Sequence, residues 1–268
     1  MKKEKRVIYY KNTLTDDFAG TSINQKKISE KYNYVPKNFF FGVTSWFLYH
    51  IIAKPLVFLM VKIIYHQKFV NKKLIKKSKG KPYFIYANHT NGMLDAYTPN
   101  IIRNRKNYIL VNPDAISIKG VGFLVKCLGG IPVPNTRKSV KNYMDSINYI
   151  VKHKNSITIY PEAHIWPYYT KIREFSDHSF RYPVDNNTPV YSLTNVYVKS
   201  KCFYRKKPRV LSVISGPFYK NNELSRLDQI KDLRNRVYNS MVDVSLRYNQ
   251  EEYIKYIQVD ESLNKATA

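Results

Sequence analysis

The chain has 268 residues, of which 44% are apolar, and its 45 Lys and Arg against 19 Asp and Glu give a formal net charge of +26. This apolar content can bury a core and excludes a disordered chain, while the charge favours polyanionic partners: anionic lipid headgroups, phosphorylated substrates, an acidic carrier protein or nucleic acid. Two cysteines in no paired motif exclude a disulfide framework and a zinc-binding motif and favour a reducing compartment.

The N-terminal quarter changes character abruptly. Residues 1–36 are polar and weakly patterned, so we expect a polar N-terminal arm, and no secretory signal peptide follows the first basic residues. Residues 37–68 contain the apolar stretch FFFGVTSWFLYHIIAKPLVFLMVKIIY. Lys54 and Pro55 lie at its middle, where a charge is most costly in a bilayer and a proline kinks a helix. We therefore expect a membrane-associated helical hairpin in one leaflet, with a true span and a buried helical pair as alternatives.

A lysine-rich run without acidic residues follows, from Lys68 to Lys81. Because it adjoins the apolar segment, attraction to anionic lipid is its most economical interpretation. A solvated loop and nucleic-acid binding are the alternatives, and no nucleic-acid-binding motif accompanies the run.

Residues 69–258 alternate short apolar runs with helical periodicity, which predicts an α/β domain with a largely parallel sheet and flanking helices, followed by a tail at 259–268. A Ser225-x-x-Asp228 signal marks the start of a long amphipathic helix. Strands are expected at 83–87, 108–111, 156–160, 189–198 and 209–215, and amphipathic helices at 140–151 and 227–244.

His89 is the first candidate for chemistry. It follows the predicted strand PYFIYA directly, and Asp95, the first acidic residue after Glu30, comes six positions later. Catalytic groups in α/β folds gather where strands end. A neutral imidazole can accept a proton near physiological pH, and a carboxylate on its other nitrogen fixes the tautomer and stabilises the imidazolium. A general base with its partner is one interpretation; a helix-capping His89 beside a carboxylate that offsets lysines is the other.

Other chemical signals are weaker. Glu162, His164, Asp177 and His178 match no metal-ligand spacing, so no metal site is expected. The chain has no phosphate-binding glycine loop and no Gly-x-Ser-x-Gly elbow, which argues against a nucleotide-binding protein and a serine hydrolase. Three aromatic residues after the Pro-Glu pair could line an acceptor pocket or simply pack: Trp166, Tyr168 and Tyr169.

The segment YANHTNGMLDAYTP resembles the first signature block of the PlsC-like glycerolipid acyltransferase superfamily, the lysophosphatidate-type enzymes. Three further segments resemble later blocks in the family's order: VNPDAISIKGVGFLVKCLGGIPVPNTR, SITIYPEAHIWP and TPVYSLTNVY. The resemblance covers about residues 82–216. Four ordered blocks are far more specific than any one of them.

The resemblance implies that His89 is the general base and Asp95 its orienting partner. It places Glu162 and His164 near the acceptor and Arg137 on an anionic group of that acceptor. Five residues separate His89 from Asp95, one more than is usual in the family. Thr136 stands where the family has Asp, and Ala163-His164-Ile165 replaces Gly-Thr-Arg, so a second phosphate-binding cation would have to come from Lys171 or Arg173.

The resemblance further implies a membrane-associated acyltransferase of phospholipid biosynthesis, on the cytoplasmic face of the cell membrane. A fatty acyl group would pass from a thioester on coenzyme A or acyl carrier protein to a hydroxyl of a lysophospholipid-like acceptor, without an acyl-enzyme. No cofactor and no nucleic-acid partner are expected. Alternative acceptors are a glycolipid, a polysaccharide intermediate or an aminoacyl lipid, and a non-catalytic lipid- or nucleic-acid-binding protein is the alternative from another class.

Overall fold

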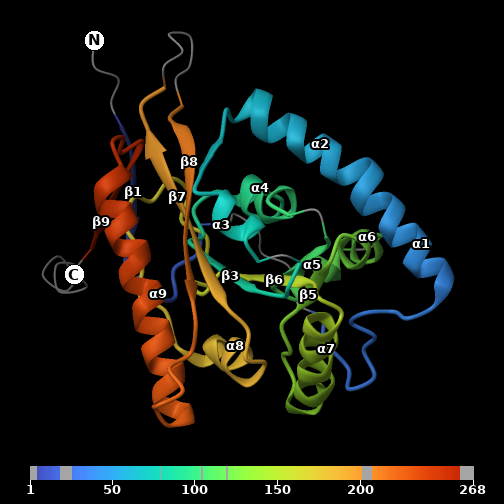
Figure 1. The fold of residues 1–268 in the computed structure, drawn as a ribbon. Helices are drawn as coiled ribbons and strands as arrows, with labels where there is room; N and C mark the ends of the chain where they lie inside the picture. The colour runs from blue at the N-terminus through green and yellow to red at the C-terminus, as the bar shows by residue number, and fades with distance from the viewer. Residues whose placement is uncertain are drawn as a thin grey trace, which may run out of the picture.

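A seven-stranded sheet forms the centre of the molecule (Figure 1). The computed structural model describes residues 5–18, 26–78, 80–103, 105–118, 120–200 and 207–259. The strands lie in the order β2-β8-β7-β3-β6-β4-β5, and every neighbouring pair is parallel except β7 with β8. The predicted largely parallel sheet is therefore confirmed. The strands are β2 (Lys68–Val70), β3 (Phe84–Ala87), β4 (Asn107–Val111), β5 (Gly130–Pro132), β6 (Ser156–Ile159), β7 (Val190–Val198) and β8 (Arg209–Phe218).

Helices cover both faces of this sheet, which explains why its central strands are buried at every position. The apolar stripes of α7 and α9 pack with β3 and β6 in the largest core cluster, as their periodicity predicts. Ser225 caps α9, its hydroxyl accepting the N–H of Asp228. The helices of the domain are α3 (Lys73–Lys76), α4 (Gly92–Asp95), α5 (Asp114–Ser117), α6 (Val121–Cys127), α7 (Val140–Lys152), α8 (Arg181–Asp185) and α9 (Arg226–Tyr248); single turns are η3 (Thr98–Ile101), η4 (Arg137–Ser139) and η5 (His178–Phe180).

The apolar N-terminal segment is one uninterrupted helix, Phe39–Ile64, hereafter the long helix. It differs from the hairpin expected at Pro55. A π-helical stretch immediately precedes the Lys54-Pro55 pair, and its wider turn makes room for a ring that lacks an N–H and would clash with a regular preceding turn. Its successive parts are α1 (Phe39–Phe47), η1 (Leu48–Ala53), α2 (Lys54–Leu59) and η2 (Met60–Ile64).

The long helix touches the domain along a narrow stripe. Tyr49, Val57 and Val61 are buried against the domain, while most of the large apolar side chains of this helix are exposed. In Figure 1 it lies across the side of the domain opposite α9. By length and composition it could cross a membrane. An exposed apolar surface of this size indicates contact with lipid or another protein.

The N-terminal arm is more ordered than expected. β1 (Arg6–Tyr10) pairs in parallel with β9 (Ile254–Gln258) in a separate two-stranded sheet. Ile28 and Tyr34 join the main core. The lysine-rich run likewise holds β2 and α3 rather than only a loop. Residues 1–4 and 19–25 of the expected arm, and 260–268 of the expected tail, lie outside the described residues.

Candidate active site

His89 lies just beyond the carboxyl end of β3 and pairs with Asp95. Its Nδ1 is 2.9 Å from Asp95 Oδ2; the His89 side chain is 24% exposed, whereas that of Asp95 is 0% exposed. Because Nδ1 faces the carboxylate, Nε2 is the nitrogen left to accept a proton. The two residues that the sequence singled out are thus in direct contact.

A capped turn accommodates the extra residue between them. Asn91 caps α4, and its backbone N–H donates to Asp95 Oδ2 at 2.8 Å. Gly92 permits a close approach, since a Cβ there would lie 2.9 Å from Ile165 Cδ1. The turn therefore brings Asp95 back to His89 despite the longer spacing.

Asn195 on β7 holds Asp95 from the other side, a contact that the sequence analysis missed. Its Nδ2 donates to Asp95 Oδ1 at 3.1 Å. Asn88 fixes this residue through both of its amide atoms, accepting the Asn195 N–H at 2.7 Å and donating to the Asn195 carbonyl at 3.0 Å. The only sequence signal was a side-chain amide within the strand expected at 189–198. Burial raises the pKa of the Asp95 carboxyl, an effect that the hydrogen bond to His89 opposes.

Glu162 is buried and supports the backbone of His89. Its Oε2 accepts the His89 N–H at 3.0 Å, and its Oε1 accepts the Arg173 N–H at 3.0 Å. The Arg173 guanidinium lies 3.2 Å from Oε2, with side-chain exposures of 1% for Arg173 and 0% for Glu162. Burial raises the pKa of the Glu162 carboxyl, and the charge of Arg173 opposes that rise. Arg173 therefore points inward and is not presented to solvent as a second phosphate-binding cation.

The two remaining predicted acceptor residues, His164 and Arg137, lie outside the lining of the cavity that contains His89. His164 faces the N-terminal arm, where its Nδ1 is 3.4 Å from Asp17 Oδ2. Arg137 begins η4, beyond the carboxyl end of β5, and is exposed. Neither residue lines the cavity that contains His89. The structure thus brings His89, Asp95 and Glu162 together, whereas Arg137 and His164 do not line the cavity that contains His89.

Aromatic residues after the Pro-Glu pair pack rather than line this cavity. Trp166 is fully buried between Tyr10, Phe18 and Tyr256, and its backbone N–H donates to the His89 carbonyl at 3.0 Å. Its indole N–H donates to the carbonyl of Asp16 at 2.8 Å. The N-terminal arm thereby braces the segment that follows Glu162.

His89 opens into a cavity of about 560 Å³ at the carboxyl edge of the sheet. Aliphatic side chains from β4 and β6 form part of the wall, and the polar side chains in it include His178 and Ser176. The lining is Ile109, Leu110, Val111, Asn112, Pro113, Val133, Tyr143, Ile159, Tyr160, Pro161, Ala163, Ser179, Tyr182, Gly92 and Ala96, with His89, Ser176 and His178. Within the described residues, no group of three His, Cys, Asp or Glu side chains could hold a metal ion.

The chain is similar to known acyltransferases. Residues 66–195 match the family described as acyltransferases. The crystal structure of the 1-acyl-sn-glycerophosphate (LPA) acyltransferase PlsC from Thermotoga maritima is similar, with a TM-score of 0.52 and 15% sequence identity over 80% of this chain and 98% of that one. No curated protein sequence gives a significant match. Residues 66–195 therefore form an acyltransferase-family domain, and the chain has a PlsC-like fold.

Proposed function

We propose that the protein moves a fatty acyl group from an acyl thioester to a hydroxyl of a lysophospholipid-like acceptor at a membrane surface, with His89 as general base. The observation that carries the proposal is the His89 Nδ1–Asp95 Oδ2 contact of 2.9 Å at the mouth of an apolar cavity. A histidine oriented by a buried carboxylate and open to a substrate cavity is the arrangement that general-base catalysis requires.

The chemistry follows from the orientation of the imidazole. As the acceptor oxygen attacks the thioester carbonyl, its proton passes to Nε2 of His89, and Asp95 stabilises the imidazolium that forms. The tetrahedral intermediate then collapses, the carbon–sulfur bond breaks, and the thiolate takes the proton from His89. Each turnover therefore returns the histidine to its neutral form, and the enzyme carries no acyl group between steps.

The cavity walls suit an acyl chain. Ile109, Val111 and Ile159 present aliphatic surface beside His89, and burial of methylene groups is favourable by about 0.8 kcal/mol each. An acyl chain inserted along these walls would present its carbonyl end to the histidine. The donor would be acyl-coenzyme A or acyl carrier protein, and no cofactor takes part in the proposed step.

The acceptor's anionic group is assigned to Arg137, the exposed cation past the carboxyl end of β5. Guanidinium groups bind phosphate in a fixed fork. The contacts of Glu162 support positioning of the His89 backbone instead of direct acceptor binding, because its carboxylate is fully buried. A direct acceptor role for Glu162 and for His164 stays a prediction.

Location on the membrane is supported by the long helix and the net charge of +26. The exposed apolar side chains of that helix can enter the acyl region of one leaflet, and nearby lysines can reach anionic headgroups. The cytoplasmic face is the side on which both proposed donors occur, and the free thiol of Cys127 is compatible with it.

The decisive experiment is replacement of His89 by alanine. The pure protein is incubated with a labelled acyl thioester and a lipid extract, and the labelled product is identified by mass spectrometry. His89→Ala should lower turnover by about 10²- to 10⁴-fold or more, as expected for loss of a general base. His153→Ala is the matched control, because that histidine is exposed at the end of α7, and it should keep full activity. Near-normal turnover by His89→Ala would contradict the mechanism.

A further inference from the structure

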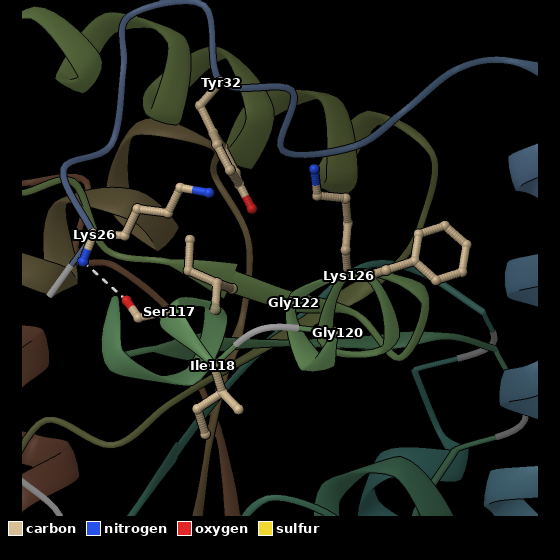
Figure 2. Close-up of a pocket in the computed structure, with 9 residues that line it drawn as sticks. Lys26, Tyr32, Ser117, Ile118, Gly120, Gly122 and Lys126 are labelled. Carbon is tan, nitrogen blue, oxygen red and sulfur yellow. Dashed lines mark hydrogen bonds between the residues drawn. The ribbon is translucent and has the colours of Figure 1, made fainter. Parts of the chain in front are cut away.

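A second, larger cavity lies between α6 and residues 26–32, away from His89. Its volume is about 770 Å³ (Figure 2). Its lining residues share no member with the lining of the catalytic cavity. The residues that line it are Lys26, Tyr32, Ile116, Ser117, Ile118, Gly120, Gly122, Phe123 and Lys126.

The shape of this cavity is built into the backbone. Gly120 adopts a left-handed conformation (φ +82°) at the start of α6, and a Cβ on Gly122 would lie 2.9 Å from the carbonyl oxygen of Ile116. These glycines let α6 approach α5 closely. On the opposite wall, two hydrogen bonds hold the backbone of Lys26. Its N–H donates to Ser117 Oγ at 2.9 Å, and its carbonyl accepts from Asn135 Nδ2 at 3.0 Å. The lining is therefore held by the fold.

The cavity concentrates positive charge. Lys26 and Lys126 extend on either side of Tyr32 in Figure 2, and the Lys126 ammonium lies 4.4 Å from the centre of the Tyr32 ring. No carboxylate lines the cavity, and neither lysine forms an ion pair with any described residue. Burial lowers the pKa of Lys126, and the charge of Lys26 lowers it further. Two cations that repel one another across a cavity favour binding of an anion between them.

The rim of the cavity is apolar and continuous with the long helix. Phe123 is 58% exposed and Ile118 is 44% exposed. The Phe123 ring contacts Phe41 of the long helix, with 6.1 Å between ring centres, and Ser45 of that helix donates to the Cys127 carbonyl at 2.8 Å. A soluble anion would gain nothing from such a rim, whereas a membrane lipid offers acyl chains to the rim and a phosphate to the lysines.

We propose that this cavity binds the phosphate headgroup of an anionic membrane lipid, at a site separate from the catalytic cavity. Pro113 lines the catalytic cavity and Ser117 lines the second one, at opposite ends of the turn that α5 forms. The turn of α5 therefore joins the two cavities, and a lipid bound in the second one anchors the domain with the cavity of His89 next to the bilayer. This inference concerns attachment to the membrane and does not depend on which acceptor is acylated.

The test is vesicle binding in the absence of donor and acceptor. Full-length protein is titrated with phosphatidylcholine vesicles that contain or lack phosphatidylglycerol. A double variant, Lys26→Gln with Lys126→Gln, should bind the phosphatidylglycerol vesicles about 30-fold less tightly, from the known contribution of lysines near an anionic surface. Its binding to vesicles of phosphatidylcholine alone should be unchanged. Phe123→Asn should weaken binding to both kinds of vesicle, because it removes apolar contact.

The matched control removes the same charge elsewhere. Lys152 and Lys231 are exposed on α7 and α9, and replacing both by Gln should leave vesicle binding within about twofold of wild type, because neither lysine lines the cavity. Equal losses in the two double variants would show diffuse attraction and overturn the proposal. Loss of affinity for free coenzyme A with unchanged vesicle binding would assign the cavity to a soluble donor and overturn it as well. Since no turnover is measured, neither result bears on the role of His89.

Discussion

The loop that carries His89, residues 88–95, and the long helix are stabilised in contrasting ways. In the loop, the side chains of Asn88 and Asp95 are buried and hydrogen-bonded to neighbouring strands or to the loop itself. The long helix buries only a narrow stripe and leaves the rest of its apolar surface exposed. A buried polar group that loses its partner costs about 1–3 kcal/mol, whereas most exposed substitutions change stability by less than about 0.5 kcal/mol.

The loop and the long helix therefore place different requirements on their amino-acid sequences. The loop must hold one imidazole in one orientation, so its polar groups are mutually dependent. The helix must present a surface, so its individual side chains are interchangeable provided that they stay apolar. Substitutions in the loop should therefore affect catalysis and folding, and those on the outer face of the helix should affect membrane binding alone.

The largest effect on the loop side should come from Asp95→Asn. An amide in place of the carboxylate no longer stabilises the imidazolium and can hold His89 in the wrong tautomer. The turnover number should fall by about 10²- to 10⁴-fold while the Michaelis constant for the acceptor changes little. Steady-state kinetics with circular dichroism as a folding check measures both quantities. Wild-type turnover in a folded Asp95→Asn protein would remove Asp95 from the mechanism.

Arg173→Met should have the next largest effect, on stability. It leaves the Glu162 carboxylate buried without its cation, which costs about 3–5 kcal/mol. Without Arg173 the pKa of Glu162 in the folded state rises further, so the folded variant binds more protons than the unfolded chain. The free energy of unfolding of Arg173→Met should therefore fall further below that of wild type as the pH rises from acid to neutral.

Chemical denaturation at several pH values checks this prediction, with the double variant Arg173→Met and Glu162→Gln as its control. Removing the carboxylate charge should recover much of the lost stability and remove the dependence on pH. An Arg173→Met protein as stable as wild type at neutral pH would show that the pair contributes nothing to the loop.

The smallest effect concerns attachment of the long helix. Lys106 donates to Ser45 Oγ at 2.6 Å and to the Cys127 carbonyl at 2.7 Å, and burial lowers its pKa to about 8. Between about pH 8 and about pH 10.5 the unfolded chain holds a proton that the folded protein has lost, so the contribution of Lys106 to stability rises with pH. The stability of Lys106→Met relative to wild type should therefore decrease by about 1 kcal/mol per pH unit in that window.

Denaturation of both proteins over the same pH range measures this difference directly. Taking the difference cancels the titration of the tyrosines that lie away from Lys106. A difference that stays constant with pH would show that Lys106 is not desolvated at the helix junction.

The sequence predicted those parts of the molecule that local patterns determine. The strands around His89, the stripes of α7 and α9 and the Ser225 cap all follow from side-chain periodicity and capping. The contact of His89 with Asp95 was also expected. Local patterns could not reveal Asn195, because that residue reaches Asp95 only through the pairing of β7 with β3.

Two other features needed the tertiary structure. The inward orientation of Arg173 depends on Glu162 being buried, and nothing in the spacing of these residues indicates it. The long helix continues through Pro55 because a π-helical stretch precedes that residue, and this stretch has no sequence signature of its own. In each case a neighbouring part of the fold overrides the local preference.

The pairing of β1 with β9 has a consequence for the order in which the protein is assembled. These strands come from opposite ends of the described chain, and β9 is synthesised after every other strand of the fold. The arm that carries β1 also contacts Trp166, whose backbone is bonded to His89. Contacts between such distant segments form slowly because a long loop must close first. The stacking of Tyr256 on Trp166 therefore forms only after synthesis has reached β9, so a nascent or truncated chain that lacks this strand has lost part of the packing beside His89.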